Sequence, residues 1–158
     1  MLFRSDLIYP HHECERAQSE AATGEPFVRH WMHVAMVWKD GHKMSKSRGN
    51  LVFVDALRRR YDPRAIRLGL LANHYRSEWE WDEGLIDRAA DRLGTWARSV
   101  VHLKEETKPN DEEDGVLMNV RDRLDDDLDT PGALLLIDAA AREGRDVRAA
   151  AALIGVTL

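Results

Sequence analysis

The chain has 158 residues, of which 44% are hydrophobic and 32% charged, and its formal net charge is −5 at pH 7. This composition excludes a disordered chain, and no apolar run approaches the roughly 20 residues that span a bilayer, so no membrane role is expected. The acidic balance disfavours general binding to polyanions. A single cysteine excludes an internal disulfide framework, and together with the lack of a signal-peptide core it predicts a reducing, cytoplasmic setting.

Residues 1–60 predict an α/β fragment, because short apolar runs alternate with polar turns. Residues 7–9 predict the end of a strand, and residues 12–23 predict a helix that ends at Gly24. The apolar run at residues 33–38 predicts a buried strand that enters a turn at Asp40-Gly41.

Residues 61–105 carry helical periodicity, with Pro63 suited to open the first helix and Ile66, Leu70 and Leu71 expected on one face. A second helix should begin near Asp82 and bury one stripe of side chains, which are Leu85, Ile86, Ala89, Leu93 and Trp96. Residues 106–158 are expected to hold a linker and a short helical bundle. The linker falls in the charged stretch 104–114, and Asp129 and Pro131 should cap and start a later helix.

The most informative motif is Lys-Met-Ser-Lys-Ser at residues 43–47. Two compact ammonium charges on a loop of small polar residues suit a triphosphate, and Ser45 and Ser47 add hydrogen-bond donors. Negative charge builds on pyrophosphate as it leaves, so a lysine that contacts it then stabilises the transition state. We expect Lys46 to make that contact and Lys43 to assist. A solvated basic turn is the simpler alternative.

This motif, residues 5–13 (Ser-Asp-Leu-Ile-Tyr-Pro-His-His-Glu) and Trp31-Met32-His33 together resemble class I aminoacyl-tRNA synthetases. Their order and spacing are similar to those of cysteinyl-tRNA synthetase and of its relative, the mycothiol cysteine ligase. Residues 62–71 and 74–76 resemble the ligase more than the synthetase. The resemblance covers the C-terminal half of either family. It implies an α-rich α/β protein: the C-terminal part of a Rossmann-type catalytic domain followed by helical domains.

The resemblance also implies a nucleotide and amino acid site. Ser5 and Asp6 match residues near the cysteinyl-adenylate, where an aspartate can pair with the amino acid's ammonium group. Val37 matches the strand position whose backbone meets the adenine ring. A turn cap and a core valine would explain these residues equally well. Arg4 stands where the families carry glycine, so its side chain should crowd the nucleotide.

A zinc site is implied by His11 and Glu15, which match the histidine and the later glutamate that bind zinc in the synthetase family. Their spacing of four places both on one side of a helix, and both are suitable zinc ligands, although such residues often only cap and solvate a helix. The two cysteine ligands of the family have no counterpart here, and Cys14 occupies a non-ligand position. We therefore expect a partial or empty zinc site.

The function implied by the resemblance is ATP-dependent activation of L-cysteine as cysteinyl-AMP, followed by transfer to the amine of glucosaminyl-inositol. One alternative is a cysteinyl-tRNA synthetase fragment, although the acidic charge and the ligase-like ending at residues 152–158 make tRNA a less favoured partner. Another is a non-catalytic helical binding module that has lost the ATP site. Because the sequence has no HIGH-type motif, we expect the chain to be a fragment or a truncated homologue that is inactive alone.

Overall fold

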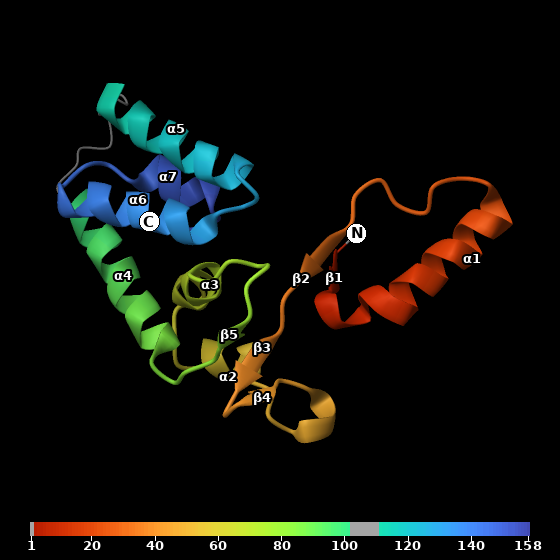
Figure 1. Ribbon diagram of the computed structural model, residues 1–158. Coiled ribbons are helices and arrows are strands. Elements are labelled where there is room, and N and C mark those ends of the chain that lie inside the picture. The colour runs from red at the N-terminus through yellow and green to blue at the C-terminus, as the bar shows by residue number, and fades with distance from the viewer. Residues whose placement is uncertain (1, 102–110) are drawn as a thin grey trace. The chain divides into compact units, whose positions relative to one another are not determined.

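The computed structural model describes residues 2–101 and 111–158 (Figure 1). The chain divides into two compact units. The first unit comprises Met1–Leu51 and Tyr75–Trp81, and the second comprises Val52–His74 and Asp82–Leu158. The linker expected at residues 104–114 lies, as far as residue 110, outside the described residues. Residues 111–114 are helical, so that part of the prediction is wrong.

The first unit holds two small sheets. In one, β1 (Leu2–Arg4) pairs in parallel with β2 (Met32–Val34), and the helix α1 (Glu13–Thr23) connects them in the sequence (Figure 1). In the other, the central strand β3 (Val37–Lys39) pairs antiparallel with β4 (His42–Lys43) and parallel with β5 (Trp79–Glu80). A parallel pair joined through a helix is the elementary unit of α/β folds, so the predicted fold class is confirmed.

Two strand predictions in this unit are wrong. Residues 7–9 form no strand, because the chain makes a 3-10 turn at Ser5–Leu7 and a π-helical turn at Ile8–His12. The Asp6 carboxylate in this turn accepts from Arg4 and Lys43, and Pro10, which follows, cannot donate to a sheet. The strand expected at residues 33–38 is divided into β2 and β3. Ala35 donates instead to the carbonyl of Tyr75, 2.8 Å away.

The second unit is helical. Its helices are α2 (Val54–Arg58), α3 (Pro63–Leu71), α4 (Leu85–Val100), α5 (Asp111–Asp125), α6 (Thr130–Arg142) and α7 (Arg148–Leu153). Asp62 caps α3 by accepting from the amide of Arg64 at 2.8 Å. Asp129 caps α6 by accepting from the amide of Gly132 at 2.9 Å, which confirms its predicted role. Pro131 is the second rather than the first residue of that helix.

Most of the buried hydrophobic residues lie in this second unit. Every residue of the stripe predicted on α4 is buried, and Trp96 is 0% exposed. The face predicted on α3 is partly wrong, because Leu70 is 46% exposed. That helix instead approaches α4 through Gly69, where an added Cβ would lie only 2.8 Å from Ile86. The largest fully buried side chains are Trp96, Leu68, Ile86, Leu134, Ile137, Val120, Val147 and Val156.

A buried polar group completes this core. The carboxylate of Asp138 on α6 accepts from the indole nitrogen of Trp96 at 2.8 Å and from the guanidinium of Arg92 at 3.1 Å. These contacts join α4 to α6 through a polar cluster whose donors and acceptors are satisfied. Over the described residues, no helix is both long enough and apolar enough to cross a membrane.

Candidate functional site

The lysine motif lies on a loop that follows β4. Lys43 pairs with Trp38 of β3 at the start of the loop. Lys46–Arg48 then form a 3-10 turn, which ends at Gly49 with a positive φ of 69°. The Asn50 side chain closes the loop, since its oxygen accepts from the Ser45 amide at 2.9 Å and its nitrogen donates to the Lys43 carbonyl at 3.3 Å. The backbone is thus held at both ends of the loop.

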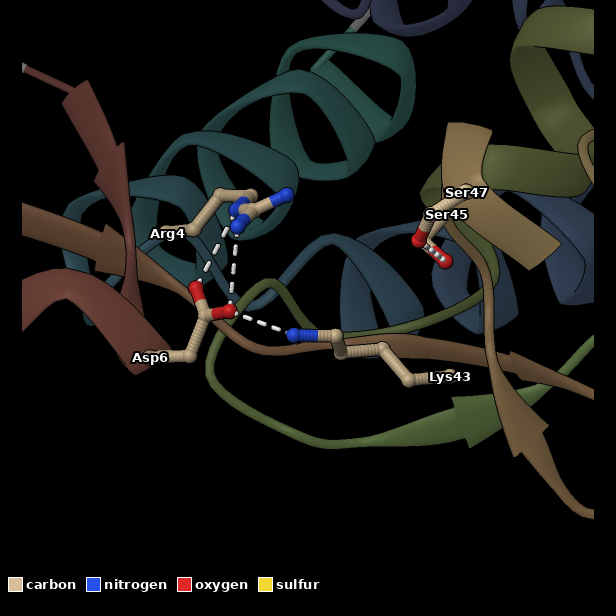
Figure 2. Close-up of polar contacts among 5 residues, drawn as sticks. All are labelled: Arg4, Asp6, Lys43, Ser45 and Ser47. Carbon is tan, nitrogen blue, oxygen red and sulfur yellow. Dashed lines mark hydrogen bonds and ion pairs between the residues drawn. The ribbon is translucent and has the colours of Figure 1, made fainter.

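The two lysines of the motif differ in their surroundings. The Lys43 ammonium lies 2.6 Å from an oxygen of Asp6 (Figure 2). Lys46 is exposed, and it forms no ion pair with any residue that the structure describes. The hydroxyls of Ser45 and Ser47 lie 3.3 Å apart beside it. An exposed ammonium next to two hydroxyls can bind an anion without first leaving a carboxylate.

Asp6 carries a second cation. Arg4 donates to both carboxylate oxygens, with its Nε 3.1 Å from one and its Nη2 3.0 Å from the other (Figure 2). The hydrogen bond from Lys43 lowers the pKa of Asp6 below its ordinary value, partial burial opposes this, and the charge of Arg4 adds to the lowering. The carboxylate is therefore ionised at neutral pH. From the sequence we expect the Arg4 side chain to crowd the nucleotide. In the structure its guanidinium is directed at Asp6.

The other predicted nucleotide contacts lie in the same unit. Ser5 begins the 3-10 turn that carries Asp6. Val37 lies in β3, and its carbonyl accepts from the amide of Met44 at 2.9 Å, directly ahead of the lysine turn. Strand β3 thus connects the predicted adenine contact to the start of the loop.

The described residues do not fit a zinc site by themselves. His11 and Glu15 are both exposed, the first in the helical turn Ile8–His12 and the second in the first turn of α1. A protein zinc site uses three or four protein ligands, and no group of three or more His, Cys, Asp or Glu residues among those described could hold a metal. No chemical step is therefore assigned to a metal here.

A histidine and tryptophan cluster near this position was not predicted. The ring nitrogens of His12 and His33 lie 3.0 Å apart, and Trp31 stacks on His33 with ring centroids 5.8 Å apart. His12 is 3% exposed, and burial, followed by the neighbouring His33, lowers its pKa. Two members of this cluster, Trp31 and His33, belong to the Trp-Met-His motif noted in the sequence. Nothing in the spacing of residues 11 and 12 indicates that His12, rather than His11, is the buried histidine.

A parallel strand pair connected through a helix, followed by a hairpin that carries a two-lysine loop, is the arrangement expected of a class I synthetase catalytic domain. The chain belongs to this family, because the family described as "tRNA synthetases class I (C) catalytic domain" matches residues 4–91.

Similar proteins carry a more specific name. The chain is 49% identical over 164 residues to the "L-cysteine:1D-myo-inositol 2-amino-2-deoxy-alpha-D-glucopyranoside ligase" of Thermobispora bispora, across 98% of this chain and 39% of that protein. It is 48% identical to the protein of the same name from Acidothermus cellulolyticus, with the same shares covered. The protein of that name from Frankia casuarinae is 53% identical over 137 residues, which are 85% of this chain and 28% of that protein. The chain thus spans less than half the length of these relatives.

A solved structure supports the fold. The agnB2 LeuRS of Agrobacterium radiobacter K84, in its ternary complex with tRNA and LeuAMS, matches this chain with a TM-score of 0.67 and 15% sequence identity. The match covers 97% of this chain and 24% of the LeuRS chain. At this identity the likeness concerns the fold alone.

Proposed function

We propose that this chain supplies part of an ATP-dependent cysteine ligase, which activates L-cysteine as cysteinyl-AMP and joins it to the amine of glucosaminyl-inositol. The observation that carries the proposal is the 49% identity, across 98% of this chain, to a protein named as that ligase. Since the chain spans 39% of that relative, the proposed activity belongs to the longer protein. A cytoplasmic location is part of the proposal, because the substrates and the single cysteine suit a reducing compartment.

The proposed reaction has two steps. The cysteine carboxylate attacks the α-phosphorus of ATP, forming cysteinyl-AMP and releasing pyrophosphate. The amine of glucosaminyl-inositol then attacks the activated carbonyl, an amide bond forms, and AMP leaves with the bonding electron pair. The amine's proton passes to solvent or to a base.

Each residue of the site has a proposed role in these steps. Lys46, with the hydroxyls of Ser45 and Ser47, binds the phosphates that leave as pyrophosphate, and Lys43 assists. The Asp6 carboxylate receives the ammonium group of cysteine, with Ser5 beside it. The backbone of Val37 faces the adenine. Zinc binding through His11 and Glu15 would require ligands from outside the described residues.

The acceptor is the point at which the two enzymatic alternatives differ. The family description names tRNA synthetases, whereas the relatives compared above are named as ligases of glucosaminyl-inositol. The net charge of −5 favours the ligase, because tRNA requires a basic surface.

An acceptor experiment with a hybrid enzyme tests the proposal. In the hybrid, the matching segment of the Thermobispora bispora ligase is replaced by this chain. We expect the hybrid, given ATP and cysteine, to form an amide with glucosaminyl-inositol that is detected by mass spectrometry. A parallel reaction with tRNA in place of the sugar should give no cysteinyl-tRNA above background.

The Lys46→Ala form of the hybrid is the matched control. Any activity that comes from the remaining part of the host ligase alone would survive this substitution. A folded hybrid that charges tRNA and leaves glucosaminyl-inositol unreacted would replace the proposed function with the synthetase alternative. A folded hybrid that does neither would favour the non-catalytic module.

A further inference from the structure

The Asp6 carboxylate is shared unequally between two cations. Arg4 holds it with two hydrogen bonds of 3.0 and 3.1 Å, whereas Lys43 holds it with one ammonium contact of 2.6 Å to the oxygen that Arg4 also contacts through Nη2 (Figure 2). The side chains of Asp6, Lys43 and Arg4 are 26%, 37% and 50% exposed. A small cation in solution can therefore reach this carboxylate.

A third cation would exchange with one of the two rather than add to them. The group of three side chains already has a net charge of +1, so a further cation would gather three positive charges around one carboxylate. Arg4 is only two residues from Asp6 and binds as a planar fork, which fixes its geometry. Lys43 binds through a single point charge on a flexible four-carbon stem. Lys43 is thus the cation that a competing amine displaces.

We propose that Asp6 is an exchange site for a primary ammonium group, at which the amine of the incoming amino acid replaces Lys43 and releases its side chain toward the anion at the lysine loop. This inference rests on the proposed function. It assigns Lys43 a role distinct from that of Lys46. The Lys43 side chain is released only when an amine occupies the amino acid site. Lys46 is available to phosphate whether or not that site is occupied.

The loop geometry allows the exchange to occur without refolding. The backbone at Lys43 is held by its pairing with Trp38 and by the hydrogen bond from Asn50 to its carbonyl. Only the lysine side chain therefore needs to move. Because coupling between two sites is reciprocal, an amine that frees Lys43 strengthens anion binding, and a bound anion strengthens amine binding by the same factor.

Lysine acetylation of the 158-residue chain, read by mass spectrometry, measures the exchange. The result is the ratio of the Lys43 rate to the Lys46 rate in one sample, so reagent consumed by an added amine cancels. Asp6→Asn should raise this ratio about 2- to 5-fold, the range that corresponds to loss of an exposed ion pair. Asp40→Asn removes the same charge from the neighbouring turn and should leave the ratio unchanged.

Ligands then test the exchange in the unaltered chain. Saturating cysteine should raise the ratio toward the Asp6→Asn value, and N-acetylcysteine, which lacks the ammonium group, should not. In the Asp6→Asn chain cysteine should have no further effect. An unchanged ratio in Asp6→Asn, or an equal rise with N-acetylcysteine, would overturn the proposal.

A simple amine separates this inference from the proposed function. Methylammonium is compared with tetramethylammonium at matched ionic strength, since only the first can donate hydrogen bonds to the carboxylate. A rise with methylammonium and no response to cysteine would support the exchange site and contradict cysteine as the amine that occupies it in this chain. If neither methylammonium nor cysteine changed the ratio of the Lys43 rate to the Lys46 rate, the exchange site itself would be refuted.

Discussion

Lys46→Ala should lower the rate of adenylate formation in the hybrid enzyme by roughly 10² to 10³, the range seen when one preorganised charge-stabilising donor is lost. The ammonium is exposed on a turn whose base is fixed by Asn50, so it can meet charge that develops on pyrophosphate. Because that charge is greatest in the transition state, the Michaelis constant for ATP should change much less than the rate.

The two reaction steps should respond differently to this substitution. Transfer from preformed cysteinyl-AMP to the acceptor amine should be nearly unchanged, since pyrophosphate has already left. Lys46→Arg should restore only part of the lost rate, because a planar fork does not replace a point charge on a tight turn. Pre-steady-state measurement resolves the two steps. Equal slowing of both would show that the loop organises the whole site, and the assignment of Lys46 to pyrophosphate would be wrong.

Trp96→Ala should lower the free energy of unfolding of the helical unit by about 3 to 5 kcal/mol, as expected for truncation of a large buried aromatic residue. Trp96 is 0% exposed, and its indole nitrogen donates to Asp138. The substitution leaves a cavity between α4 and α6 and removes a hydrogen bond from a buried carboxylate. Since a domain of this size is stable by only about 5 to 15 kcal/mol, much of its stability would be lost.

Two further variants separate the causes of this loss. Trp96→Phe keeps most of the ring and removes the donor, so it should cost about 1 to 3 kcal/mol. Leu135→Ala, on the exposed side of α6 at 63% exposure, should change stability by about 0.5 kcal/mol or less. Urea unfolding followed by far-ultraviolet circular dichroism measures all three variants. A Trp96→Ala protein as stable as the Leu135→Ala control would show that this junction is not the centre of the core.

The sequence predicted best the features that depend on local chemistry. A glycine with positive φ ends α1, an aspartate caps α6, and an apolar stripe at helical spacing identifies the buried face of α4. These signals lie within a few residues of the structure that they specify.

The features that could not be predicted depend on contacts between distant residues. The division between β2 and β3 follows from backbone hydrogen bonds to residues 75–81, which return to the first unit far along the chain. Asp6 and Lys43 are 37 residues apart, and the pair formed by His12 and His33 spans 21 residues. A turn of the chain decides which of two adjacent histidines is buried, and composition and spacing do not encode that turn.

Cysteine-dependent exchange of radioactive pyrophosphate into ATP measures cysteine activation by itself, because it requires no acceptor. We expect exchange by the hybrid enzyme, its loss in the Lys46→Ala hybrid, and none by the isolated chain, which spans 39% of the relative's length. If a correctly folded hybrid gave no exchange, this chain would not be part of a cysteine-activating enzyme, and strong cysteine-dependent exchange by the isolated chain would show that the activity does not need the rest of the relative's length.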